Sequence, residues 1–218
     1  MVKDVKLIIF DLDGTIVDTI YDLAAAAEHM SMKHGDYAVD VQLAKKCIGN
    51  GLKLFLSRIY NFFGIHSERF DEELAEFRRY YLDHSCVKTR LFDDTLYVLK
   101  ELRKMDKQMA VATMKPYDPA VKILGHFGIL EYFTKVIGGD MMGEPKPSPW
   151  CVKLLEKQYN VNPGKILVVG DGMTDVDMAV NAGAHSVALL NGYGNRDDLL
   201  NSRAEYKLPV LGGILEIL

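Results

Sequence analysis

The chain lacks the features that mark disulfide-bonded and membrane-spanning proteins. It has three cysteines, Cys47, Cys86 and Cys151, and no Cys-x-x-Cys pair, which predicts free thiols in a reducing compartment. No apolar run approaches the roughly 18 residues that a membrane span needs. Asp4 and Lys6 interrupt the first apolar residues, so no signal peptide is expected. We therefore predict a cytoplasmic protein without a membrane partner.

A dense block of lysine and arginine is also missing. The chain has 26 Lys and Arg against 30 Asp and Glu, a formal net charge of −4, which argues against a nucleic-acid partner. An anionic substrate is compatible with this charge if local cations and helix N-termini receive it. With 218 residues, of which 49% are apolar and 26% charged, the chain has the composition of a globular protein with a sizeable core.

Short apolar runs alternate with helical periodicity over much of the chain. Strands are predicted at residues 7–10, 109–113, 136–137, 166–169 and 186–190. Helices are predicted at residues 95–104, 119–127 and 149–159. Alternating strands and helices imply right-handed crossovers and a parallel sheet covered on both faces. We therefore predict an α/β fold with a Rossmann-like parallel sheet as its core.

The alternation fails between Asp18 and about Arg90. There the chain shows helical periodicity without an obvious strand, at residues 20–32, 41–48, 52–63 and 68–85. A long all-helical insert after the first strand is typical of a separate small bundle. We predict that residues 1–17 and 91–218 form the α/β core, and that residues 18–90 form a helical cap over the carboxyl end of the first strand.

Two carboxylates follow the first predicted strand. Asp11 ends the apolar run 7–10, and Asp13 comes two residues later, before a Gly-Thr turn. Residues two apart on an extended segment point the same way, and open parallel sheets bind ligands at the carboxyl ends of their strands. Two like charges this close are costly unless a cation or a proton is shared. The pair favours metal or acid/base chemistry over the alternative, a plain Asp-Gly turn.

Two later positions could hold an anion. Thr113 ends the predicted strand 109–113 and is followed by Met114. A hydroxyl and free backbone N–H groups at a strand end can hold a phosphoryl oxygen, although such a threonine is usually a cap. Lys146 lies in the segment 144–149, whose prolines hold it extended and present the lysine from a stiff loop. The alternative is an ordinary surface lysine.

A second pair of carboxylates follows the predicted strand 166–169. Asp171 comes just after this strand, and Asp175 lies four residues later, near the start of a helix. Asp175 could simply complement the helix dipole, which is worth about 0.3–1 kcal/mol. Asp171 is a third carboxylate at a strand end and indicates a metal cage. Mg²⁺ prefers hard oxygen ligands, typically one or two carboxylates with waters and substrate phosphate.

Taken in this order, these segments resemble the motifs of the haloacid dehalogenase superfamily. Asp11-Leu12-Asp13-Gly14-Thr15 resembles its first motif, Thr113 the second, Lys146 the third, and Gly170-Asp171 with Asp175 the fourth. The helical insert resembles the family's cap. Stretches that look most like the phosphoglycolate phosphatase branch are residues 48–51, 113–116 and 137–140.

The resemblance implies a Mg²⁺-dependent phosphatase acting on a small phosphorylated metabolite, with phosphoglycolate as the leading candidate. It implies that Asp11 attacks phosphorus and forms an aspartyl-phosphate. Asp13 would protonate the leaving oxygen and then deprotonate the attacking water. Mg²⁺ would be held by the Asp11 carboxylate, the Asp13 backbone carbonyl and Asp171.

The resemblance assigns further residues to substrate binding. Thr113 and Lys146 would orient the phosphoryl oxygens, and Met114 stands where relatives often carry Asn. Asp175 would act through water or against Lys146. In the cap, Asn50 could offer its amide to the substrate, although Gly-Asn-Gly suits a helix–helix turn equally well.

Two other functions are compatible with the same motifs. One is a sugar phosphomutase of the β-phosphoglucomutase type, and the other is a non-catalytic binding protein of the same fold. The complete set of motif residues argues against the binding protein. A carboxylate at Asp13 favours phosphate ester chemistry over the family's dehalogenase and phosphonate-cleaving branches. A monomer and a homodimer are both compatible with the sequence.

Overall fold

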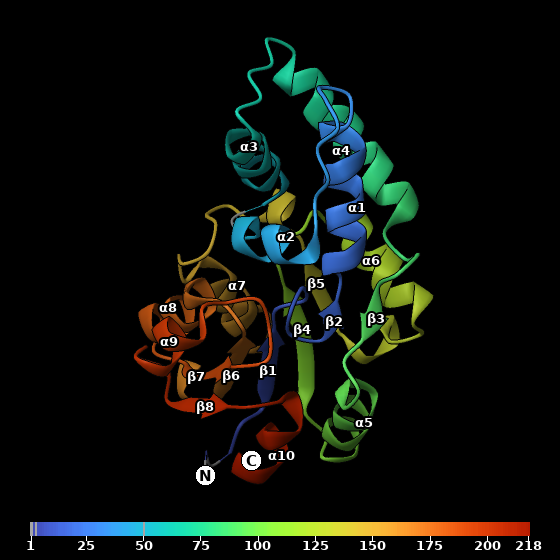
Figure 1. The fold of residues 1–218 in the computed structure, drawn as a ribbon. Helices are drawn as coiled ribbons and strands as arrows, with labels where there is room; N and C mark the ends of the chain where they lie inside the picture. Colours follow the sequence, from blue (N-terminus) through green and yellow to red (C-terminus); the bar gives the residue numbers. More distant parts are fainter. Residues whose placement is uncertain (1, 3, 50) are drawn as a thin grey trace. The chain divides into compact units, whose positions relative to one another are not determined.

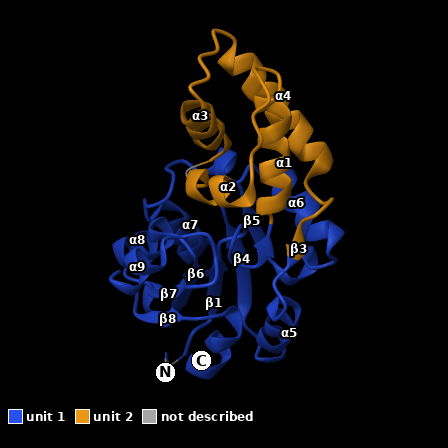
Figure 2. Ribbon diagram, viewed as in Figure 1, with its two compact units in different colours: residues 1–18, 91–218 blue, residues 19–90 orange. Residues whose placement is uncertain are grey.

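The computed structural model describes residues 2, 4–49 and 51–218. The chain divides into two compact units: Met1–Asp18 with Leu91–Leu218 (unit 1), and Thr19–Arg90 (unit 2), which Figure 2 colours separately. Two-residue strands lie where the chain passes between the units, β2 (Val17–Asp18) and β3 (Arg90–Leu91). Unit 2 thus interrupts unit 1 shortly after its first strand. The role of unit 2 as a cap stays a prediction.

Unit 1 is built on a six-stranded sheet in the order β5-β4-β1-β6-β7-β8 (Figure 1), and its neighbouring strands run parallel. The strands are β1 (Leu7–Phe10), β4 (Gln108–Ala112), β5 (Lys135–Ile137), β6 (Ile166–Gly170), β7 (His185–Leu189) and β8 (Tyr206–Leu208). The register places Phe10 beside Val111 of β4 and Val169 of β6, so three carboxyl ends lie level. The predicted α/β fold with a Rossmann-like parallel sheet is confirmed.

The central strand β1 forms because its sequence can be buried completely. All four of its residues are 0% exposed. Since side chains alternate between the faces of a strand, this burial shows that both faces of the sheet are covered, as in other parallel sheets. On one face, Leu7 and Ile9 share a cluster with Val152 of α7 (Trp150–Tyr159) and Met178 of α8 (Met173–Ala182).

The remaining helices of unit 1 follow the other strands. They are α5 (Thr95–Lys104), α6 (Tyr117–His126), α9 (Arg196–Leu200) and α10 (Ile214–Ile217). Short 3₁₀ turns occur at η1 (Leu130–Tyr132), η2 (Gly139–Met141), η3 (Pro163–Lys165) and η4 (Leu211–Gly213). The predicted helices 95–104, 119–127 and 149–159 correspond to α5, α6 and α7, whereas β8, α9 and α10 were not predicted.

Unit 2 contains the helices α1 (Ile20–Ser31), α2 (Val41–Cys47), α3 (Leu52–Phe63) and α4 (Phe70–His84). Asp40 caps the N-terminus of α2, because its side chain accepts the Leu43 N–H at 2.7 Å. Gly64 follows the last residue of α3 and adopts φ 67°, a conformation that glycine reaches without strain. The core of unit 2 is aromatic, with Phe55 stacked on Phe77 at a centroid distance of 6.0 Å.

The described residues can be compared with the predictions about membrane spans and free cysteines. None of the helices that they form is long and apolar enough to cross a membrane. The three cysteines are free, as predicted, with Cys47 and Cys151 buried and Cys86 partly exposed.

Candidate active site

The end of β1 places Asp11 against a buried lysine. The Asp11 N–H continues the sheet by donating to the Val169 carbonyl at 2.9 Å. Its carboxylate accepts from the Lys146 Nζ at 3.0 Å, and the same ammonium lies 2.5 Å from the Asp175 carboxylate. The Lys146 side chain is 2% exposed. The interpretation of Lys146 as an ordinary surface lysine is therefore wrong.

Asp171, just after β6, is held by two hydrogen bonds. The Thr15 hydroxyl donates to one carboxylate oxygen at 2.8 Å, and the Tyr193 N–H donates to the other at 2.7 Å. The turn after β1 lies so close to the Asp171 carboxylate that a Cβ on Gly14 would be 2.3 Å from Asp171 Oδ2. Gly14 also adopts φ 84°, so both space and backbone require glycine there.

Asp175 lies in the first turn of α8 but faces the interior. One carboxylate oxygen accepts the Gly172 N–H at 3.1 Å, while the other pairs with Lys146. A Cβ on Gly170 would come within 2.4 Å of this side chain, so the strand end must be glycine for Asp175 to fit. Asp175 thus lies in the first turn of the helix and contacts Lys146 directly. This contact is one of the two arrangements expected for it, the other being an interaction through water.

Three carboxylates meet at this edge of the sheet. Asp11, Asp171 and Asp175 each offer an oxygen within 4.8 Å of the others. Carboxylate oxygens are a donor type that Mg²⁺ prefers, so this donor set fits the predicted metal. The Asp13 side chain is outside this group, and its predicted contribution is the backbone carbonyl.

Burial makes the charges of these groups costly. Burial, with smaller contributions from the charges of Asp175 and Asp171, raises the pKa of Asp11 to about 7, against the lowering effect of Lys146. Burial and the charge of Asp175 raise the pKa of Asp171 to about 6, against its hydrogen bonds from Tyr193 and Thr15. Burial alone would lower the pKa of Lys146, but Asp11 and Asp175 raise it. A divalent cation would relieve the repulsion among the carboxylates.

A second buried lysine completes the site and was not predicted. Lys115 has a side chain that is 1% exposed, and its Nζ lies 3.0 Å from Asp13 Oδ1. Each carboxylate of the first motif therefore has its own lysine. Lys115 and Lys146 both directly precede a proline, a restriction that keeps the residue in an extended conformation. That shared feature was the available sequence signal.

The other predicted binding residues have different surroundings. Thr113 is buried just after β4; its N–H is not free, because it donates to the Ile137 carbonyl at 3.0 Å. The Thr113 hydroxyl accepts the Lys115 N–H at 3.2 Å. Met114 is half-buried beside it. Asn50 lies outside the described residues.

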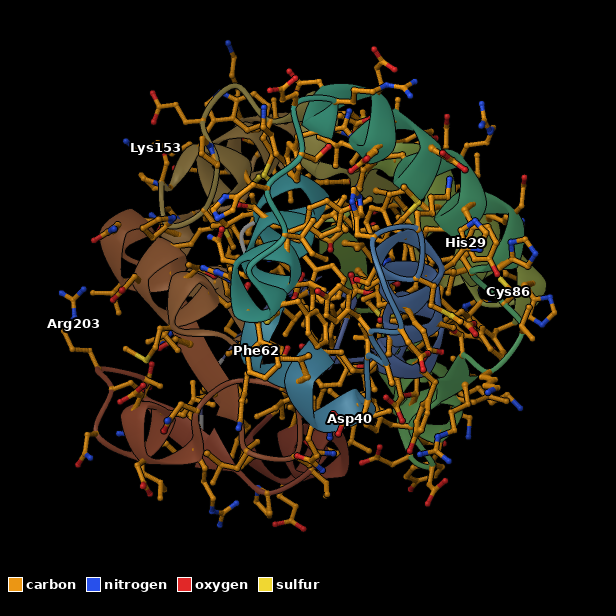
Figure 3. All side chains as sticks on the ribbon, turned by 45° about the horizontal axis from the view of Figure 1, so that its top comes forward. His29, Asp40, Phe62, Cys86, Lys153 and Arg203 are labelled. Atoms are coloured by element: carbon orange, nitrogen blue, oxygen red, sulfur yellow. The ribbon has the colours of Figure 1, made fainter. Side chains whose placement is uncertain are left out.

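The buried lysines differ from the other cations of unit 1. Side chains such as Lys153 and Arg203 extend outward into solvent (Figure 3). The arrangement around Asp11 instead joins a carboxylate at the end of a strand to a buried ammonium and two more carboxylates. Such a site can bind a metal and an anion together, and it offers Asp11 as a nucleophile.

Comparisons with known proteins show the family of the chain. Residues 8–189 match the family model of the haloacid dehalogenase-like hydrolases. A phosphoglycolate phosphatase of Vibrio parahaemolyticus is 32% identical over 220 residues, which cover 99% of this chain and 96% of that protein. A phosphoglycolate phosphatase of Neisseria meningitidis is 31% identical over 221 residues, covering 99% of this chain and 93% of that protein.

A solved structure shows the same fold. The crystal structure of a predicted phosphoglycolate phosphatase from Haemophilus somnus superimposes with a TM-score of 0.93 and 29% sequence identity, covering 99% of this chain and 98% of that chain. The likeness spans both units, so the relatives are similar to the whole chain and not to its α/β core alone.

Proposed function

The chain belongs to the haloacid dehalogenase-like hydrolases, and from that premise we propose that it is a Mg²⁺-dependent phosphatase of small phosphate monoesters. One observation carries the proposal: the Asp11 carboxylate lies at a strand end in contact with Lys146 and within 4.8 Å of two further carboxylates. A nucleophile, an anion-binding ammonium and a cation-binding set are thereby joined in one place. Phosphoryl transfer needs these parts together.

The chemistry follows from the separate tasks of Asp11 and Asp13. An Asp11 oxygen attacks phosphorus in line, the bond to the leaving oxygen breaks, and an aspartyl-phosphate forms. Asp13 gives its proton to the leaving oxygen and takes one from the water that hydrolyses the intermediate. Phosphate and free Asp11 result. The bound Mg²⁺ supplies positive charge that offsets repulsion between the nucleophile and the phosphate.

Two side chains bind the oxygens of the phosphoryl group. Lys146 neutralises and orients phosphoryl oxygens, and the Thr113 hydroxyl donates to them. Asp11 and Asp171 would hold Mg²⁺ through carboxylate oxygens, with the backbone carbonyl of Asp13. Asp175 fixes Lys146, which it contacts at 2.5 Å. The two motif aspartates have separate lysine partners, since Asp11 pairs with Lys146 and Asp13 with Lys115.

Phosphoglycolate is the substrate that we propose first. The proposal rests on relatives that bear this name at 31–32% identity over nearly the whole chain. Unit 2 is proposed as the cap that selects the substrate, with Asn50 as a contact.

The test is phosphate release from a panel of esters, with and without Mg²⁺. The panel contains phosphoglycolate, sugar phosphates, nucleotides and pyrophosphate. We expect Mg²⁺-dependent release that is fastest with phosphoglycolate and that falls at least about 10³-fold in Asp11→Asn, since the nucleophile is lost. Asp36→Asn, an exposed acid of unit 2, is the matched control and should retain the wild-type rate.

Two outcomes would contradict the proposal. Release of phosphate by Asp11→Asn at the wild-type rate would exclude Asp11 as the nucleophile. Formation of a sugar bisphosphate and an isomerised sugar phosphate, without net phosphate, would identify a phosphomutase instead.

A further inference from the structure

The loop at residues 190–195, between β7 and α9, is folded around the Asp171 carboxylate. A Cβ on Gly192 would lie 2.2 Å from Asp171 Cβ, and a Cβ on Gly194 would lie 1.9 Å from the Asp171 carbonyl oxygen. Real Cβ atoms do not come this close, so both positions require glycine for the loop to reach the carboxylate. Tyr193 is the residue between these two glycines, and its N–H donates to Asp171 at 2.7 Å.

The side chain of Tyr193 extends from this loop to the end of the first segment of unit 1. Its hydroxyl donates to Asp18 Oδ1 at 2.9 Å. Asp18 is 7% exposed and is the last residue of unit 1 before the chain enters unit 2. One residue thus connects the Asp171 carboxylate, through its backbone, with Asp18, through its phenol.

Two glycines would otherwise leave the backbone of this segment free to move. Glycine lacks the steric restrictions that hold other residues near one conformation. The ends of the loop are tied separately: the Leu190 N–H donates to the Leu208 carbonyl, and Asn195 caps α9. The hydroxyl contact with Asp18 is an additional tie in the middle of the loop, at the residue whose N–H binds Asp171.

We propose that Tyr193 is a positioning residue, whose hydroxyl bond to Asp18 holds its own N–H, and hence the Asp171 carboxylate, in the orientation that binds a divalent cation. The inference rests on the proposed metal-dependent function and adds a residue to it. Tyr193 does not need to touch the substrate or the metal. Its contribution is to hold one carboxylate oxygen through the N–H, while the Thr15 hydroxyl holds the other, so that the carboxylate keeps a constant direction.

The test is Mn²⁺ binding by the whole protein without substrate, followed by electron paramagnetic resonance of the free ion. Tyr193→Phe removes the hydroxyl and keeps the ring and the backbone N–H. We expect Mn²⁺ affinity to fall about 3- to 10-fold, the range expected for one hydrogen bond. Amide hydrogen exchange in residues 190–195 should rise in the same variant, which reports the loss of the loop's hold directly.

Tyr159→Phe is the matched control. The Tyr159 hydroxyl also bonds between two segments of unit 1, donating to Thr134 Oγ1 at 2.6 Å. It is not a contact of Asp171, so its loss should change Mn²⁺ affinity less than about twofold. Asp18→Asn is a second variant of the same contact, because the amide oxygen is a neutral and weaker acceptor. It should lower the affinity in the same direction, by less than Tyr193→Phe does.

Wild-type Mn²⁺ affinity in Tyr193→Phe, or an equal loss in Tyr159→Phe, would overturn the inference. A wild-type protein that binds no Mn²⁺ would overturn the proposed function and this inference together. If the wild type binds Mn²⁺ but releases no phosphate from any ester, the phosphatase proposal fails alone. The effect of Tyr193 on the metal would still be measured.

Discussion

Each unit contains a buried aspartate that accepts backbone N–H groups, and the two differ in what else surrounds them. In unit 2, Asp22 is 3% exposed and accepts the N–H groups of Val87, Lys88 and Thr89 at 2.9–3.0 Å. In unit 1, Asp171 is 4% exposed and also accepts an N–H, but two further carboxylates lie within 4.8 Å of it. Burial alone therefore does not mark a functional carboxylate.

The difference lies in whether the buried charge is balanced by the fold itself. Three N–H groups satisfy Asp22 and tie the start of α1 to the segment that returns to unit 1, so its role is structural. Asp11 and Asp175 share one ammonium, Lys146, with Asp171 close to both carboxylates. Burial and the neighbouring carboxylates raise the pKa values of Asp11 and Asp171. An excess of buried negative charge is costly for a fold and useful for binding a cation.

The largest effect on this comparison should come from Lys146→Met, which removes the shared ammonium. Breaking a buried ion pair by removing one partner typically costs about 3–5 kcal/mol, so urea unfolding of the metal-free protein should show a loss of this order. The buried Asp175 and the half-buried Asp11 would then lack their cation. Because protonation relieves these carboxylates, the loss should shrink on lowering the pH from about 8 to about 5.

Lys153→Met, on the exposed face of α7, is the control for Lys146→Met. Surface substitutions of this kind usually change the free energy of unfolding by no more than about 0.5 kcal/mol. If Lys146→Met unfolded at the same urea concentration as Lys153→Met, the carboxylates of unit 1 would be as well balanced by the fold as Asp22.

Some parts of the fold and of the site could be predicted from the sequence, and others could not. Asp11 and Asp171 could be located because β1 and β6 are nearly continuous apolar runs, and a carboxylate directly after such a run must lie at the sheet edge. Strand β8 (Tyr206–Leu208) was missed because its residues are half-buried and form no apolar run. Its pairing with β7 is set by tertiary structure.

The missed residues are those whose roles depend on partners distant in sequence. Lys115 meets Asp13, and Tyr193 meets Asp18 and Asp171, from separate loops. Local sequence cannot tell whether a lysine is solvated or buried against an acid. The same holds for Asp22, whose partners follow α4 at the far end of unit 2. The roles of the predicted site residues stay proposals until they are tested by mutation.

A smaller effect is expected from Asp22→Asn, the structural member of the comparison. The amide keeps one acceptor oxygen but places an NH₂ group against backbone N–H donors. A buried donor left without its partner costs about 1–3 kcal/mol, which urea unfolding should detect. Phosphate release per folded molecule should remain at the wild-type rate, since the groups around Asp22 belong to unit 2. The exposed Asp36→Asn again serves as the control for loss of a charge.

A fall in turnover of Asp22→Asn under conditions where it is fully folded would contradict a purely structural role for Asp22. It would mean that the segment held by Asp22 takes part in the reaction, and that both buried aspartates are functional.

An effect no larger than that of Asp22→Asn concerns pH and Mg²⁺ in the wild type. In the metal-free protein the pKa values of Asp11 and Asp171 are raised to about 7 and about 6. A raised carboxyl pKa contributes stability that is complete below the ordinary value and is lost as pH rises through the raised one. Protons and metal compete for these oxygens. Stabilisation by excess Mg²⁺ should therefore grow between about pH 5 and about pH 8, by roughly 1–3 kcal/mol.

Urea unfolding with and without Mg²⁺ across this range measures the effect, and the two buried aspartates supply its controls. Asp171→Asn removes a titrating carboxylate and a proposed metal ligand, so its Mg²⁺ stabilisation should be small at every pH. Asp22→Asn leaves Asp11, Asp171 and Asp175 intact. Its Mg²⁺ stabilisation should depend on pH as in the wild type, although its free energy of unfolding is lower at every pH. Mg²⁺ stabilisation of the wild type that did not change with pH would show that the cation binds elsewhere, since proton competition follows directly from binding at these carboxylates.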